Sequence, residues 1–158
     1  MNKWKDWLKK WNMTDLKIKT SFLEMDWKPQ RADKDAAWEL YIELITRITT
    51  QDLKDNDGDE QEALESIYKI FGLTREIIKK YKLECMEFTK IAIVILNQVI
   101  RPFTAKWSKK VKHDFSQNDK KHFREELKIL QRELIVYTQM LGDMAGVEEI
   151  DDLTLLEQ

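Results

Sequence analysis

The fold is decided by residues 119–144, which read DKKHFREELKILQRELIVYTQMLGDM. Apolar side chains recur in this stretch at alternating spacings of four and three residues, namely Phe123, Leu127, Leu130, Leu134, Tyr137, Leu141 and Met144. This spacing is typical of a helix that buries one apolar stripe against neighbouring helices. We therefore predict a long helix that begins near Asn118 or Asp119 and ends between Gly142 and Gly146. Its stripe packs inside the chain or against a second copy.

Three earlier stretches are also expected to be helical. The first covers residues 33–51, and its apolar stripe is widened by Trp38 and Ile42. The second follows an acidic loop at residues 52–60. The third covers residues 84–101 and has so little polar surface that we expect it to be buried on all sides.

These four stretches predict an all-α fold, an antiparallel four-helix bundle over residues 33–146. Pro102 is expected to end or kink the third helix, because proline has no N–H to donate to the preceding turn. The chain of 158 residues suits one domain (residues 1–158), and its 4 Gly and 2 Pro provide few of the turns of a sandwich or barrel. Residues 147–158 form an acidic tail with apolar positions, which could dock on a basic patch or serve as a partner peptide.

Residues 1–30 predict a short helix followed by an extended arm. Residues 2–12 are typical of a basic amphipathic helix whose apolar face carries Trp4, Trp7 and Trp11. Apolar residues then alternate between residues 15 and 27, which favours an extended segment, either a strand or a short hairpin. A tryptophan face of this kind can lie on an anionic membrane, but we favour packing on its own domain or on a subunit.

The sequence offers no catalytic or metal-binding constellation. The acidic loop fails as a calcium site, since Leu53 and Leu64 occupy its first and last ligand positions. His113 and His122 do not follow a Glu at the spacing of a di-metal bundle. A single cysteine, Cys85, excludes a disulfide framework and a Cys-rich zinc site. We therefore predict no enzyme activity, no catalytic residue, no cofactor and no metal.

Compartment and membrane contact follow from the longest apolar stretch and from the N-terminus. Residues 91–100 are about half the length of a membrane-spanning helix, which needs roughly 20 residues. The first residues contain neither the apolar core nor the cleavage site of a secretory signal. We expect a cytoplasmic protein without a transmembrane segment.

Two groups of residues are candidates for binding. Asn97 and Arg101 lie four apart on one face of an apolar helix, where they form either a structural network or a pocket for a partner. Residues 101–113 contain no acid. This patch combines basic and aromatic side chains, as phosphate contact and base stacking require, or it is a solvated helix end: Phe103, Lys106, Trp107, Lys109, Lys110 and Lys112.

Three strings resemble a family of small, uncharacterised helical proteins from bacteria. They read DAAWELYIELITR at residues 35–47, LNQVIRPFTAKW at residues 96–107 and LGDMAGV at residues 141–147. The resemblance implies an association with bacterial conflict or antiphage loci. It also implies a His after the Lys-Trp pair, where this chain has Ser108. Any activity that depended on that His would be lost here.

The sequence therefore predicts a non-enzymatic helical module that binds another protein or a second copy of itself. The family resemblance places it as a component of an antiphage defence system. The alternative is a nucleic-acid-binding accessory protein that uses the basic patch at residues 101–113.

Overall fold

The computed structural model describes residues 2–47, 60–113 and 115–147. Within these ranges the chain is mostly helical and contains no strand, so the all-α prediction is confirmed. The acidic loop up to residue 59 and the tail from residue 148 lie outside the described residues. The elements are α1 (Trp4–Lys10), α2 (Thr20–Leu23), α3 (Arg31–Ile45), α4 (Glu60–Tyr81), η2 (Lys82–Cys85), α5 (Met86–Ile95), η3 (Leu96–Ile100), α6 (Arg101–Lys112) and α7 (Gln117–Ala145).

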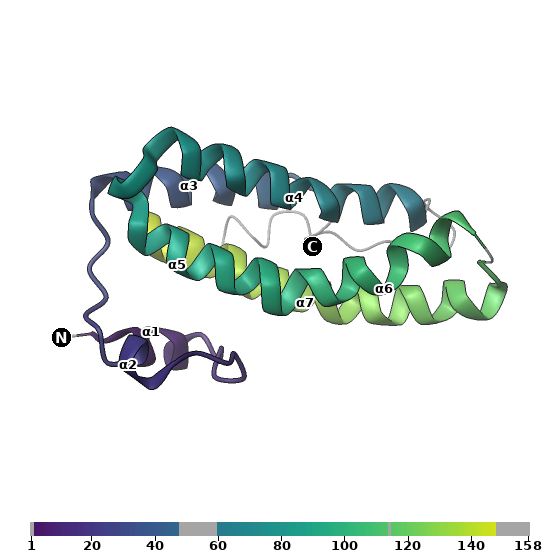
Figure 1. Ribbon diagram of the computed structural model, residues 1–158, viewed down its shortest axis with the longest axis horizontal. Helices are drawn as coiled ribbons and strands as arrows, with labels where there is room; N and C mark the ends of the chain where they lie inside the picture. Colours follow the sequence, from purple (N-terminus) through teal and green to yellow (C-terminus); the bar gives the residue numbers. More distant parts are fainter. Residues whose placement is uncertain (1, 48–59, 114, 148–158) are drawn as a thin grey trace.

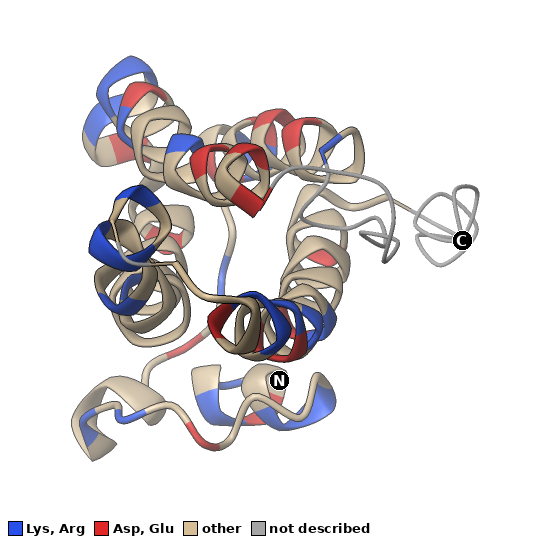
Figure 2. Ribbon diagram, turned by 90° about the vertical axis from the view of Figure 1, so that its right-hand side faces the viewer, with Lys and Arg blue, Asp and Glu red and all other residues tan. Residues whose placement is uncertain are grey.

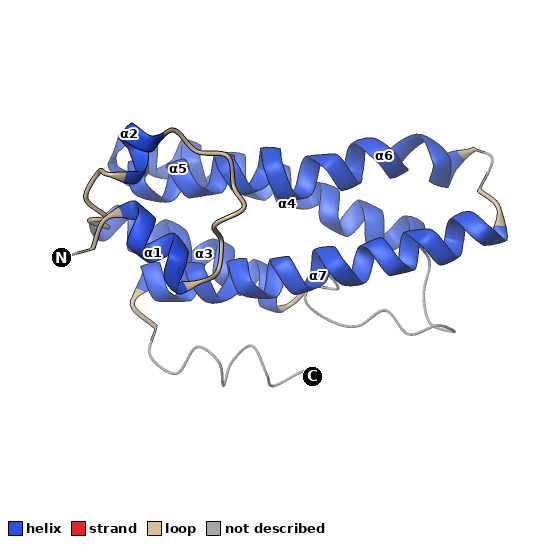
Figure 3. Ribbon diagram, turned by 90° about the horizontal axis from the view of Figure 1, so that it is seen from below, coloured by secondary structure: helices blue, strands red, loops and turns tan. Residues whose placement is uncertain are grey.

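The long helices lie side by side along the longest axis of the molecule (Figure 1). α5, η3 and α6 follow one another as a single rod, and α3 packs along α7. The short helices α1 and α2 lie against one half of the α5–α7 face and are joined by a loop that crosses it (Figure 3). The helical bundle therefore carries an N-terminal arm, residues 2–28, near one of its ends.

α7 agrees with its predicted apolar stripe. Ser116 caps its start, because the Ser116 Oγ accepts the Asp119 N–H at 3.1 Å and the Asp119 carboxylate accepts the Ser116 N–H at 3.2 Å. Gly146 ends it in the left-handed conformation that glycine adopts most easily, with φ of 80°. All seven stripe residues are buried. The stripe is therefore occupied by the chain itself and offers no seam to a second copy.

Of the two outcomes expected for the third helix at Pro102, an end or a kink, the structure excludes the end. The rod does not end there but continues to Lys112, and the turn before the proline widens into the π-helical η3. A widened turn moves the preceding carbonyls away from the proline ring. It also accommodates the loss of the hydrogen bond that the proline nitrogen cannot donate. The prediction of burial on all sides is wrong, because Met86 and Ile93 are 40% and 47% exposed. The neighbouring elements cover only part of the rod's circumference.

The strand or hairpin predicted within the arm is absent from the described residues. Residues 20–23 form the single turn α2, and the only pairing of strand type among the described residues is an isolated bridge between Lys3 and Asp26. The side chain of Gln98 takes the place of a neighbouring strand. Its amide oxygen accepts the Lys17 N–H at 2.7 Å, and its amide nitrogen donates to the Lys17 carbonyl at 2.8 Å. The Gln98 carboxamide satisfies both the N–H and the C=O of Lys17, a residue of extended backbone. It pairs with this residue alone, so it does not start a β-ladder.

The N-terminal tryptophan helix packs on its own chain, as favoured. Trp4 and Trp7 are 0% and 2% exposed, so their rings are not available to a membrane. The indole N–H of Trp4 donates to Glu87 at 3.3 Å, and that of Trp7 donates to Asp143 at 2.8 Å. Trp11 donates to the same Asp143 oxygen at 3.3 Å. These contacts attach the arm to α5 and α7.

Asp33 holds the starts of two helices together. Its carboxylate accepts the Gln30 N–H at 2.7 Å at the beginning of α3, and the Phe88 N–H at 3.0 Å at the beginning of α5. The residue is only 1% exposed. Because the first N–H groups of a helix have no partner within the helix, one buried carboxylate satisfies donors from both helices.

Replacing Asp33 with alanine tests this connection. Asp33→Ala leaves two backbone donors without an acceptor, so the free energy of unfolding should fall by about 2–4 kcal/mol. Urea unfolding followed by far-UV circular dichroism measures the change. The control Asp35→Ala removes a more exposed carboxylate on the same helix and should change stability by less than about 0.5 kcal/mol. Equal losses for the two variants would contradict the assigned role of Asp33.

Candidate protein-interaction surface

A tight turn between α4 and α5 exposes a large apolar side chain. η2 provides the whole connection, and Lys82 at its start adopts a left-handed backbone conformation with φ of 58°. For a residue with a Cβ this conformation costs about 1–2 kcal/mol. Leu83, the next residue, is 80% exposed, the largest fraction among the exposed large hydrophobic residues of the described chain.

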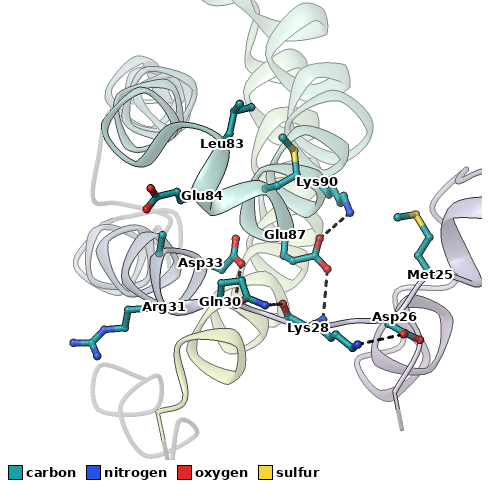
Figure 4. A pocket seen from close by; sticks show the side chains of 12 residues that line it. Met25, Asp26, Lys28, Gln30, Arg31, Asp33, Leu83, Glu84, Glu87 and Lys90 are labelled. Atoms are coloured by element: carbon teal, nitrogen blue, oxygen red, sulfur yellow. Dashed lines mark hydrogen bonds and ion pairs between the residues drawn. The ribbon is translucent and has the colours of Figure 1, made fainter.

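A hollow of about 710 Å³ lies beside Leu83, between η2, the start of α5 and the chain that leads into α3 (Figure 4). Figure 4 shows Leu83 and Met25 on different sides of the hollow. Met25 and Met86 are 46% and 40% exposed. We call the surface formed by Met25, Leu83, Met86 and this hollow the apolar end.

Most charged groups that line the hollow are already paired. Glu87 is largely covered and accepts the Lys90 ammonium at 2.7 Å, in addition to the Trp4 indole. Asp26 accepts the Lys3 ammonium at 3.0 Å, and the Lys28 ammonium lies 3.6 Å away. The hydrogen bond from Lys3 and its charge, together with Lys28, hold the pKa of Asp26 below its usual value. The charges of Glu87 and Asp26 are therefore balanced by lysines of the same chain.

Two lining residues remain available to a partner. The side chain of Arg31 is 90% exposed, and its ion pair with Asp35 is long at 3.6 Å. Glu84 is exposed and has no ion-pair partner in the described part of the chain. Both side chains point away from the hollow on the same side of it (Figure 4). The apolar end thus carries one charge of each sign at its rim.

The predicted polar pair lies on the surface and not in the core. Asn97 and Arg101 are both exposed, and the Arg101 Nε donates to the Asn97 Oδ1 at 3.3 Å. The Arg101 guanidinium lies 4.9 Å from the centre of the Phe71 ring. The pair therefore does not form part of the core, because the face of the rod that bears it is not covered.

The aromatic side chains of the predicted basic patch are buried and do not belong to its surface. Phe103 and Trp107 are 7% and 1% exposed, and their rings lie 5.3 and 5.4 Å from the ring of Phe123 on α7. The two residues lie four apart, which places them on the face of α6 that meets α7. The prediction that these rings stack on bases is wrong, since both are occupied in the core.

The lysines of the patch divide into paired and unpaired groups. Lys106 lies 2.7 Å from Glu126, and Lys110 lies 3.7 Å from Asp119. Lys109 and Lys112 are exposed and have no ion-pair partner among the residues that the structure describes. These two remain available for contact with phosphate.

Two further features of the described residues concern metal binding and membrane crossing. They contain no group of three or more His, Cys, Asp or Glu side chains that could hold a metal ion. Cys85 is buried, and burial raises the pKa of its thiol, which disfavours the reactive thiolate. No described helix combines the length and the apolar character that crossing a bilayer requires.

Sequence reasoning missed the apolar end because its residues come from three segments. Met25 was assigned to the arm and Met86 to a buried helix. One signal was present in the sequence: Leu83 stands between Lys82 and Glu84 and is out of phase with the stripe of α4. Comparison with known proteins adds no assignment, because no family model, no curated protein and no solved structure matches the chain.

Proposed function

We propose that the chain is an antiparallel four-helix bundle that performs no catalysis and binds another protein through its apolar end. The side-by-side packing of α3, α4, the α5–η3–α6 rod and α7 supports the architecture. The resemblance of residues 96–107 to a bacterial family supports a setting in a cytoplasmic antiphage system.

The exposure of Leu83 is the observation that carries the proposal. Burial of a leucine side chain contributes about 1.5–3 kcal/mol, yet Leu83 is 80% exposed on a turn that begins with a strained residue. Two half-exposed methionines, Met25 and Met86, line the same hollow, and methionine adapts its shape to a partner more easily than branched residues do. A cluster of exposed apolar side chains rimmed by charges is typical of a protein-binding surface.

Capture from a lysate of the source organism tests this function. Leu83→Asp should reduce the recovery of specific bound proteins by about tenfold or more, because it places a charge where the partner buries an apolar side chain. The matched control is Ile129→Asp on α7, since Ile129 is apolar and 50% exposed but lies outside the apolar end. Quantitative mass spectrometry of the captured proteins measures the effect.

Both variants should keep the far-UV circular dichroism of the parent chain. Recovery of the same proteins by Leu83→Asp would contradict the proposal. A chain that is strictly monomeric and captures no protein would contradict it as well.

A second candidate function is supported by charge. Residues 101–128 contain nine Lys and Arg against four Asp and Glu, although the whole chain has a formal net charge of -2. Figure 2 looks onto the end where α6 and α7 are joined, with Lys and Arg on both helices. Because Phe103 and Trp107 are buried, this surface suits the phosphate backbone of a duplex and not the stacking of single-stranded bases.

Salt dependence tests the second candidate. If Lys109, Lys112 and Lys121 each contact a phosphate, the affinity for duplex DNA should fall about 40-fold between about 50 and 200 mM salt. Fluorescence anisotropy with a labelled duplex measures this. Lys109→Glu with Lys112→Glu should abolish binding, whereas Lys34→Glu with Lys79→Glu should leave it unchanged. Absence of binding to duplex and single strands at about 50 mM salt would eliminate this candidate.

A further inference from the structure

We propose that the partner of the apolar end is a second copy of the same chain, related to the first by a two-fold axis. This inference rests on the proposed function. In such a dimer the same patch lies on both sides of the interface, so it must be complementary to itself in shape and in charge. The apolar end meets both requirements.

The shape of the apolar end combines a projection with a recess. Leu83 projects from η2 with 80% of its surface exposed, and the hollow of about 710 Å³ lies directly beside it. Met25 and Met86 line the hollow with apolar, adaptable side chains. Leu83 of each copy can therefore enter the hollow of the other, which buries both leucines.

The charges of the apolar end are also self-complementary. Among the rim charges, Glu84 has no ion-pair partner in the described part of the chain, and Arg31 and Lys28 have only long contacts of 3.6 Å, with Asp35 and Asp26 respectively. The 3.6 Å contact of Arg31 with Asp35 is solvent-exposed and contributes little. A two-fold axis that passes between Arg31 and Glu84 would place each Arg31 opposite the Glu84 of the other copy. A purely basic or purely acidic partner would instead meet one like charge.

Two other surfaces that could receive a second copy do not meet these requirements. The stripe of α7 is buried within the chain. A groove of about 490 Å³ between α3 and α4 exposes Trp38, but Glu39, Glu43 and Glu76 line it against a single lysine. Two copies facing each other through this groove would bring carboxylates together.

Sedimentation velocity of the full chain between about 1 and 100 µM tests the inference. The parent chain should dimerise, and Leu83→Asp should remain monomeric. Arg31→Glu alone and Glu84→Arg alone should each weaken the dimer by about tenfold or more, because each variant puts like charges opposite each other twice. An equimolar mixture of these two variants should dimerise again, since every Arg–Glu pair is restored between unlike chains.

Recovery in the mixture cannot result from misfolding, so it distinguishes an interface from a loss of stability. Ile129→Asp serves as the control and should dimerise like the parent chain. A parent chain that stays monomeric at about 100 µM, a dimer that survives Leu83→Asp, or a mixture that stays monomeric would overturn the inference. Loss of a captured protein by Leu83→Asp in a monomeric chain would overturn only this inference and leave the proposed function in place.

Discussion

The structure depends on one buried carboxylate. Asp33 accepts backbone N–H groups from the starts of α3 and α5, which holds these two helix ends against each other. A buried carboxylate is tolerated only when its oxygens are hydrogen-bonded, so this contact has little freedom to change. With the start of α5 fixed, the chain must reverse from α4 within the four residues of η2. The left-handed Lys82 and the outward Leu83 are consequences of that short reversal.

The N-terminal arm completes the surface that this reversal creates. Met25 belongs to the arm, whereas Leu83 and Met86 belong to the bundle, so the apolar end exists only while the arm is docked. Three polar side chains of the bundle fix the arm: Asp143 and Glu87 accept tryptophan N–H groups, and Gln98 pairs with the backbone of Lys17. The buried rings of Trp4 and Trp7 supply the apolar contact area. The arm therefore forms one side of the proposed binding surface.

Much of the fold could be predicted because helix patterns are local. Spacing alone indicates the apolar stripe of α7 and the apolar face of the N-terminal tryptophans, and the structure buries both within the chain. The π turn before Pro102 and the pairing of Gln98 with Lys17 depend on contacts between distant segments, so spacing could not indicate them. For the same reason, spacing could not indicate the proposed binding surface. Aromatic residues among lysines indicated a nucleic-acid patch, but Trp107 faces the core.

The central claim is that the single chain holds Leu83 outward before any partner arrives. Methyl NMR of dilute protein in the presence of a soluble nitroxide tests it most directly, because the nitroxide broadens the signals of solvent-exposed methyl groups. The account predicts strong broadening of the Leu83 methyl signals, with those of the fully buried Leu40 and Leu134 unaffected. Leu83 signals as well protected as those of Leu40 would contradict it.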